Sequence, residues 1–140
     1  MKNILRFSLV ALMFMSVLVA CKENKKADAP AVEETQGVIE FISPGNLAQL
    51  DLNSLQLIDV RKQEEMAKGA IPGAQNMDYF ADDFESQVQT LDKSKPIYVY
   101  CKIGGRSARA AVKLQEMGFE QIYDLDGGIM AWIDQGNNIE

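Results

Sequence analysis

Four short segments of the chain carry the residue pattern of β-strands. The segment Val38–Ile42 alternates apolar and polar positions, as an edge strand does, and the other three are short apolar runs: residues 55–60, Ile97–Tyr100 and Gln121–Leu125. Apolar residues recur at helical spacing outside these runs, which predicts four helices: residues 44–50, 81–91, 106–117 and 128–135. Strands that alternate with helices predict an α/β fold, a doubly wound parallel sheet of about five strands with helices on both faces.

Several of the predicted helix ends carry residues that favour them. Ser43 followed by Pro44 suits a helix start, with a capping hydroxyl and a proline at the first helical position. Gly118 suits a helix end, and Phe119 stands where it would contact the last turn. Trp132 has helical spacing with neighbouring apolar residues, so we expect it in the core.

The first 37 residues have a different pattern from the rest. Lys2 and Arg6 precede an apolar run, residues 7–20, which has the layout of a secretory signal and is short for a membrane span. The run ends at a cysteine, Cys21, and this junction resembles the bacterial lipobox. That resemblance implies cleavage before Cys21 and lipidation of its thiol; the alternative is a plain signal peptide with an incidental cysteine. Residues 22–37 are polar and charged, which predicts a flexible tether.

The expected organisation is therefore a lipoprotein signal peptide (1–20), a lipidated cysteine with its tether (21–37) and one folded domain (38–140). We expect an exported protein, lipid-anchored to a bacterial membrane on the periplasmic side or at the cell surface. Residues 38–140 carry 9 Lys and Arg against 16 Asp and Glu, a net charge of −7. An acidic domain has no electrostatic reason to bind nucleic acid.

The chain has two cysteines and no histidine. If Cys21 is lipidated, Cys101 has no partner within the chain, and an unpaired cysteine in an exported protein indicates a reactive thiol. The alternative is a buried and inert cysteine. Cys101 directly follows the predicted strand Ile97–Tyr100, and ligands bind beyond the carboxyl ends of strands in open parallel sheets. Its position therefore favours chemistry.

The connection from this strand to the next helix is the sequence CKIGGRS, residues 101–107. Two adjacent glycines allow a turn whose amides point inward as an anion-binding cradle, and the helix start adds the positive end of its dipole. Such a site lowers the pKa of a cysteine, so Cys101 is a nucleophile that needs no histidine base. The residues expected to bind substrate around it are Lys102 and Arg106 through their charge, Ile103, Gly104 and Gly105 through their amides, and Ser107 through its hydroxyl.

Three sequence blocks in order resemble the single-domain rhodaneses. They are D-V-R with G-x-I-P-G-A-x-N, then C-x-x-G-x-R-S with A-x-A-A-x-x-L-x-x-x-G-F, then Y-x-L-x-G-G-I-x-A-W. The first block comprises Asp59, Val60, Arg61, Gly69, Ile71, Pro72, Gly73, Ala74 and Asn76, together with Glu64 or Glu65. The second comprises Cys101, Gly104, Arg106, Ser107, Ala108, Ala110, Ala111, Leu114, Gly118 and Phe119, and the third Tyr123, Leu125, Gly127, Gly128, Ile129, Ala131 and Trp132.

This resemblance, which covers about residues 38–132, implies a rhodanese-like fold and a sulfurtransferase of the thiosulfate type. Cys101 would carry sulfane sulfur as a persulfide, taken from a small anionic donor such as thiosulfate and passed to a thiol or cyanide. We expect no metal and no cofactor. The alternatives are a membrane-tethered relay that delivers persulfide to a membrane-associated acceptor protein, and a rhodanese-like binding module without significant turnover.

Two details of the sequence bear on the resemblance. The family commonly has a histidine where this chain has Ala70, which puts substrate preference or local packing in doubt. Related phosphatases and arsenate reductases have five residues between cysteine and arginine, whereas Cys101 and Arg106 have four between them, which favours the sulfurtransferase form. We expect Arg61 to pair with Asp59 or a nearby glutamate as a structural contact.

Overall fold

The computed structural model describes residues 36–140, which belong to one compact unit. The predicted signal peptide, Cys21 and most of the predicted tether lie outside the described residues. No helix among residues 36–140 is both long and apolar enough to cross a membrane.

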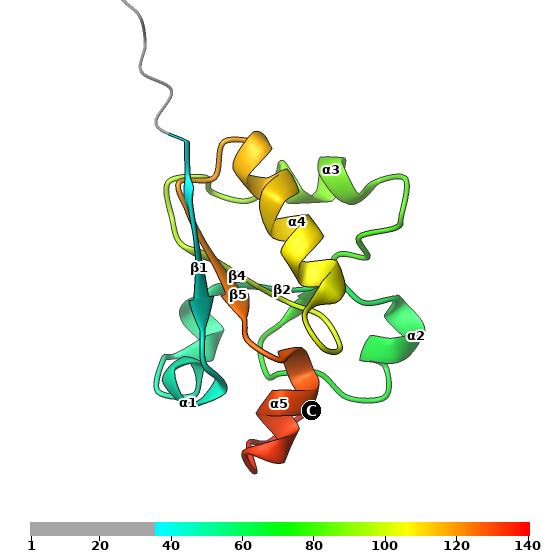
Figure 1. Ribbon diagram of the computed structural model, residues 1–140. Coiled ribbons are helices and arrows are strands. Elements are labelled where there is room, and N and C mark those ends of the chain that lie inside the picture. Colours follow the sequence, from blue (N-terminus) through cyan, green and yellow to red (C-terminus); the bar gives the residue numbers. More distant parts are fainter. Residues whose placement is uncertain (1–35) are drawn as a thin grey trace, which may run out of the picture. The chain divides into compact units, whose positions relative to one another are not determined.

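A five-stranded sheet forms the centre of the domain (Figure 1). Its strands are β1 (Val38–Ile42), β2 (Gln56–Asp59), β3 (Gln75–Asn76), β4 (Ile97–Tyr100) and β5 (Gln121–Leu125). Their order is β1-β5-β4-β2-β3, and every neighbouring pair is parallel. The predicted α/β fold with about five parallel strands is confirmed. The sequence did not predict β3, a two-residue strand that pairs with β2.

The helices connect the strands and cover both faces of the sheet. They are α1 (Pro44–Leu47), α2 (Gln63–Met66), α3 (Phe84–Val88), α4 (Gly105–Glu116) and α5 (Gly128–Asp134), with a 3₁₀ turn at Leu52–Ser54. Figure 1 shows α3 near α4, and α1 near α5. The helices predicted at 44–50 and 81–91 are shorter than expected, and α2 was not predicted.

Two apolar clusters, one on each face of the sheet, hold these layers together. One lies under α3 and α4 and comprises Ile58, Val60, Met77, Phe84, Val88, Ile97, Val99, Cys101, Ala110, Ala111, Leu114, Phe119 and Ile122. The other lies under α1 and α5 and comprises Leu47, Leu57, Ile71, Tyr100, Leu125, Ile129 and Trp132. Successive residues of a strand face opposite sides, so β4 sends Val99 and Cys101 to one face and Tyr100 to the other. Burying each large aliphatic side chain contributes about 1.5–3 kcal/mol.

The start of α1 and the end of α4 lie where the sequence predicts them. The amide of Asn46 donates to Ser43 Oγ at 3.2 Å, and Pro44 begins α1. At the end of α4, Gly118 has a φ of 90° and Phe119 donates from its amide to the carbonyl of Leu114 at 3.1 Å. Phe119 is fully buried against the cluster under this helix, which explains why α4 ends there.

Candidate active site

Cys101 lies directly beyond the carboxyl end of β4, which the strand order places in the middle of the sheet. Its side chain is 1% exposed and forms no disulfide among residues 36–140. The amide of Gly104 donates to Cys101 Sγ at 3.1 Å. Gly104 caps α4 with a φ of 108°, a conformation that favours glycine, and this brings its amide to the sulfur. Of the three amides expected to form the cradle, those of Ile103, Gly104 and Gly105, the structure shows that of Gly104 on the sulfur.

The environment of Cys101 favours its ionised form. Burial by itself raises the pKa of the thiol, but the hydrogen-bonding groups around the sulfur outweigh it and the pKa is lowered. These groups are the amide and hydroxyl of Ser107 and the amides of Gly104 and Arg106. In the structure the Ser107 hydroxyl donates to the carbonyl of Gly104 at 3.1 Å, so the sulfur is an alternative acceptor for the same proton. The first turn of α4 thus activates the thiol without a histidine.

The start of α5 holds the other side of the loop. The amide of Ile129 donates to the carbonyl of Cys101 at 2.9 Å, and that of Met130 donates to the carbonyl of Lys102 at 3.1 Å. Gly128 precedes them with a φ of 61°, and a Cβ there would lie 2.6 Å from the oxygen of Cys101. Gly128 therefore permits a close contact between α5 and the backbone of the Cys101 loop.

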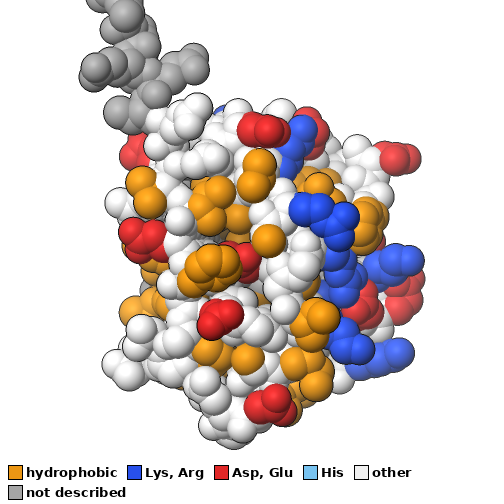
Figure 2. Space-filling model, in the orientation of Figure 1, with side chains coloured by type: hydrophobic (Ala, Val, Ile, Leu, Met, Phe, Trp, Pro, Cys, Tyr) orange, Lys and Arg blue, Asp and Glu red, His pale blue; other side chains and the backbone are white. Residues whose placement is uncertain are grey.

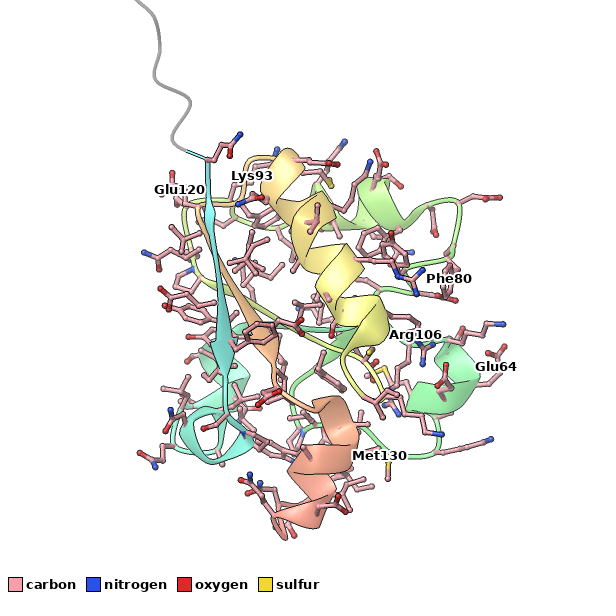
Figure 3. The ribbon with its side chains drawn as sticks, in the orientation of Figure 1. Glu64, Phe80, Lys93, Arg106, Glu120 and Met130 are labelled. Carbon is pink, nitrogen blue, oxygen red and sulfur yellow. The ribbon has the colours of Figure 1, made fainter. Side chains whose placement is uncertain are left out.

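Arg106 is held by an acidic residue of α2. Its guanidinium makes two hydrogen bonds to the carboxylate of Glu65, at 2.6 and 2.8 Å. The hydrogen bond to Arg106 is the main reason why the pKa of Glu65 is lowered to about 2. Figure 3 shows Arg106 beside α2, the helix that also carries Glu64. Glu65 and the sulfur both raise the pKa of Arg106, so this cation lies near Cys101 in a fixed orientation.

The other predicted substrate-binding residues lie on the outside of the loop. Lys102 is exposed, and Ile103 is 70% exposed. Gly105 begins α4 and has open space above it. A shallow hollow of about 220 Å³ beside the loop is lined in part by Lys102, Lys68 and Met130. Figure 2 shows Lys and Arg side chains gathered on the side of the molecule where α2 and the start of α4 lie.

The residues of the D-V-R block and of the segment before I-P-G make structural contacts with one another and with the C-terminal residue. Arg61 pairs with Asp59 and donates to the carbonyl of Gly69 at 2.8 Å, so the predicted structural pairing with Asp59 is confirmed. Ala70, in the position where a histidine was expected, is buried, and its backbone exchanges hydrogen bonds with that of Glu140 at 2.8 and 3.0 Å.

Sequence reasoning missed two residues near Cys101. Glu65 was named as one of two glutamates of the D-V-R block and as a possible partner of Arg61, because nothing local links α2 to Arg106, 41 residues away. Asp124 was overlooked although its signal was present, since an acid in the middle of an apolar strand stands out. It is 2% exposed, and its Oδ1 has no hydrogen-bond partner among the described residues.

Comparisons with known proteins agree with this site. Residues 46–135 match the rhodanese-like domain family. The chain is 41% identical over 78 residues to the putative sulfurtransferase YtwF of Bacillus subtilis, covering 56% of this chain and 73% of that protein. It is 34% identical over 92 residues to the thiosulfate sulfurtransferase GlpE of Pseudomonas aeruginosa, covering 65% of this chain and 81% of that protein.

Among solved structures, a rhodanese-related protein from Thermoplasma volcanium superimposes with a TM-score of 0.64 at 28% identity. The superposition covers 72% of this chain and 97% of that one. The family match spans well over half of the 140 residues and includes every residue of the Cys101 loop, so the chain belongs to the rhodanese-like domain family.

Proposed function

We propose that this chain is a sulfurtransferase that moves sulfane sulfur from thiosulfate or a similar donor to a thiophilic acceptor through a persulfide on Cys101. The observation that carries the proposal is the hydrogen bond from the Gly104 amide to Cys101 Sγ, in a loop whose groups lower the pKa of the thiol. Relatives named as sulfurtransferases support the same class of reaction.

In the first step the Cys101 thiolate attacks the outer sulfur of thiosulfate. A new S–S bond forms to Cys101, the S–S bond of thiosulfate breaks, and sulfite leaves with the bonding electron pair. The total charge of −3 is the same on both sides. The terminal sulfur of the persulfide then carries the negative charge that the thiolate carried before. Amides at the start of α4 are suited to stabilise an anion at this place.

In the second step a nucleophile attacks that terminal sulfur. Cyanide would leave as thiocyanate, and a thiolate would leave as a persulfide; both return Cys101 to its thiolate with no external oxidant. Arg106 is suited to attract anionic substrates, since its cation lies near the sulfur while Glu65 fixes its orientation. Lys102 adds an exposed cation at the rim.

The deciding experiment is an intact-mass measurement before and after incubation with thiosulfate. The full chain carries Cys21→Ser so that Cys101 is its single thiol, and the matched control carries Cys101→Ser as well. We expect a gain of one sulfur atom with Cys101 present, reversed by a thiol, and no gain in the control. An unchanged mass with thiosulfate and other sulfane donors would refute the proposal, and hydrolysis of an aryl phosphate would instead favour a phosphatase.

A membrane-associated protein acceptor is a second possibility, favoured by the exposure of apolar residues near the thiol. Ile103 is 70% exposed at the loop and Met130 is 40% exposed beside it, which suits contact with a protein surface. A relay of this kind would load once with sulfur and then stall with cyanide or small thiols. Steady-state formation of thiocyanate would establish the enzyme instead, whereas a binding module would not load at all.

We also propose that the chain is exported and anchored through a lipid on Cys21. The support is the sequence alone: a basic start, an apolar run and a cysteine at its end. Several acyl chains on one residue would hold the domain at a membrane through the tether. Expression in a bacterium should give a membrane-bound mature protein that begins at Cys21, and Cys21→Ser should abolish the acylation. A mature N-terminus at another residue would contradict the anchor.

A further inference from the structure

A buried carboxyl group lies under the activated loop. Asp124 belongs to β5 and pairs in register with Val99 of β4, two residues before Cys101. It is 2% exposed, and its Oδ1 has no hydrogen-bond partner among residues 36–140. Successive side chains of a strand point to opposite faces, so Asp124 faces the same side of the sheet as Ile122, which is the side that α4 covers. An acid left without a partner in this place calls for an explanation, since burying an unpaired carboxylate is costly.

Ser107 lies between this acid and the sulfur. It is fully buried in the first turn of α4, the helix that covers this side of the sheet, and its hydroxyl lowers the pKa of both the Asp124 carboxyl and the Cys101 thiol. A serine hydroxyl has one proton to donate and can accept from another donor. In the structure this proton goes to the carbonyl of Gly104 at 3.1 Å, and Cys101 Sγ and an ionised Asp124 are the alternative acceptors that the proposal below uses.

We propose that Asp124 is a positioning residue of the active site and acts on Cys101 through Ser107. A protonated Asp124 donates to the Ser107 oxygen, which leaves the Ser107 proton free for the thiolate or persulfide. An ionised Asp124 draws that proton to itself and adds a like charge under the sulfur. The role in sulfur transfer depends on the function proposed above, whereas the coupling between the three groups does not.

The position of Asp124 makes this device sensitive to mildly acidic pH. Burial raises the pKa of Asp124 to about 6; the contact with Ser107 lowers it, and the nearby charge of Asp126 raises it. The groups that act on its pKa are Ser107 from α4 and Asp126 beyond its own strand, while the neighbouring strands place Val99 of β4 and Phe41 of β1 in register with it. No Lys or Arg among the described residues donates a hydrogen bond to this carboxyl. Ionisation of Asp124 is therefore opposed by its burial and by the charge of Asp126, and only Ser107 favours it.

The test is the rate at which iodoacetamide alkylates Cys101 between pH 4 and pH 9. It uses the full chain with Cys21→Ser, alone and with Asp124→Asn, which keeps the shape and a donor but cannot ionise. In the parent we expect two coupled steps, one near pH 6. Asp124→Asn should leave one step, with alkylation near pH 7 roughly 3- to 10-fold faster because the thiolate forms at lower pH.

Two control comparisons exclude a merely structural effect. Asp126→Asn removes an exposed acid two residues away and should shift the profile far less. In a Ser107→Ala background, Asp124→Asn should lose most of its effect, because the group that transmits it is gone. Superimposable profiles for the parent and Asp124→Asn would refute the proposal.

Coupling must also be reciprocal, which gives a test that does not depend on the folding of the Asp124 variant. Carboxyl NMR of the otherwise unmutated site should show a lower pKa for Asp124 when Cys101→Ser removes the thiolate. If the pKa of Asp124 is the same with and without Cys101→Ser, the coupling is refuted. Because neither measurement uses a sulfur donor, a chain that fails to load sulfur but shows the coupling would refute the sulfurtransferase function alone.

Discussion

Replacing Gly128 by alanine tests the contact between α5 and the catalytic loop. A Cβ at this position would lie 2.6 Å from the carbonyl oxygen of Cys101 and 2.7 Å from the carbonyl carbon and oxygen of Lys102. These are backbone atoms, so no flexible side chain can move aside. Either the loop or the start of α5 must shift, and the hydrogen bonds from the amides of Ile129 and Met130 are then lost or weakened.

The expected cost has two sources. A residue other than glycine in a left-handed conformation costs about 1–2 kcal/mol, and Gly128 has a φ of 61°. Each lost hydrogen bond adds about 0.5–1.5 kcal/mol, and more where a buried group stays unsatisfied. We therefore expect Gly128→Ala to lower the free energy of unfolding by about 3 kcal/mol. Gly136→Ala is the matched control, since Gly136 has a φ of 79° but nothing within 4 Å of the added Cβ, and it should cost only about 1 kcal/mol.

Urea unfolding of residues 36–140 measures both variants, and alkylation of Cys101 reports on the site. A displaced loop carries the Gly104 amide away from the sulfur, so Gly128→Ala should alkylate more slowly at neutral pH than Gly136→Ala. The reasoning fails if the two variants have the same stability to within about 0.5 kcal/mol and the same alkylation rate.

Two further substitutions test contacts around the site. Glu65→Gln removes the charge that holds Arg106 and should cost about 1 kcal/mol at pH 7, a modest value because the pair is partly exposed. The pKa of Glu65 is lowered to about 2, so the extra stability of the parent over Glu65→Gln is fully present above the ordinary pKa of about 4.5 and should vanish as pH falls to about 2. Urea unfolding of both chains across this pH range measures it. A difference in unfolding free energy that does not change with pH would contradict it. Tyr100→Phe removes the oxygen that accepts from the amide of Ile71 at 3.2 Å and should cost about 1–3 kcal/mol, whereas a neutral effect in urea would show that this buried amide finds another acceptor.

The parts of the fold that the sequence predicts well are those with a local cause. Strands β1, β4 and β5 have the predicted bounds because each is an uninterrupted run with its own pattern. The helix predicted at 81–91 extends only over Phe84–Val88, and beyond its end the Thr90 hydroxyl donates to the carbonyl of Gln87. Such bonds between side chains and backbone compete with the helix, and apolar spacing alone does not predict where they end it.

The features that sequence reasoning missed depend on distant contacts. Strand β3 is two residues long and is defined by its pairing with β2, so no pattern of its own could mark it. Helix α2 has no buried residue, and Glu65 acquires its role only when the fold brings Arg106 to it. Cys101 and Gly104 were identified because their roles arise within one turn, whereas the burial of Asp124 depends on the cover that α4 provides.

Activation of the thiol by backbone amides has a consequence for how chains of this kind can change over time. The donor that reaches Cys101 Sγ is a main-chain N–H, which every residue except proline possesses. Substitutions at the exposed Lys102 and Ile103 would alter the charge and shape offered to a substrate while the chemistry beneath them stays the same. We therefore expect single substitutions on this surface to change which substrate is preferred while the reactivity of the thiol changes little.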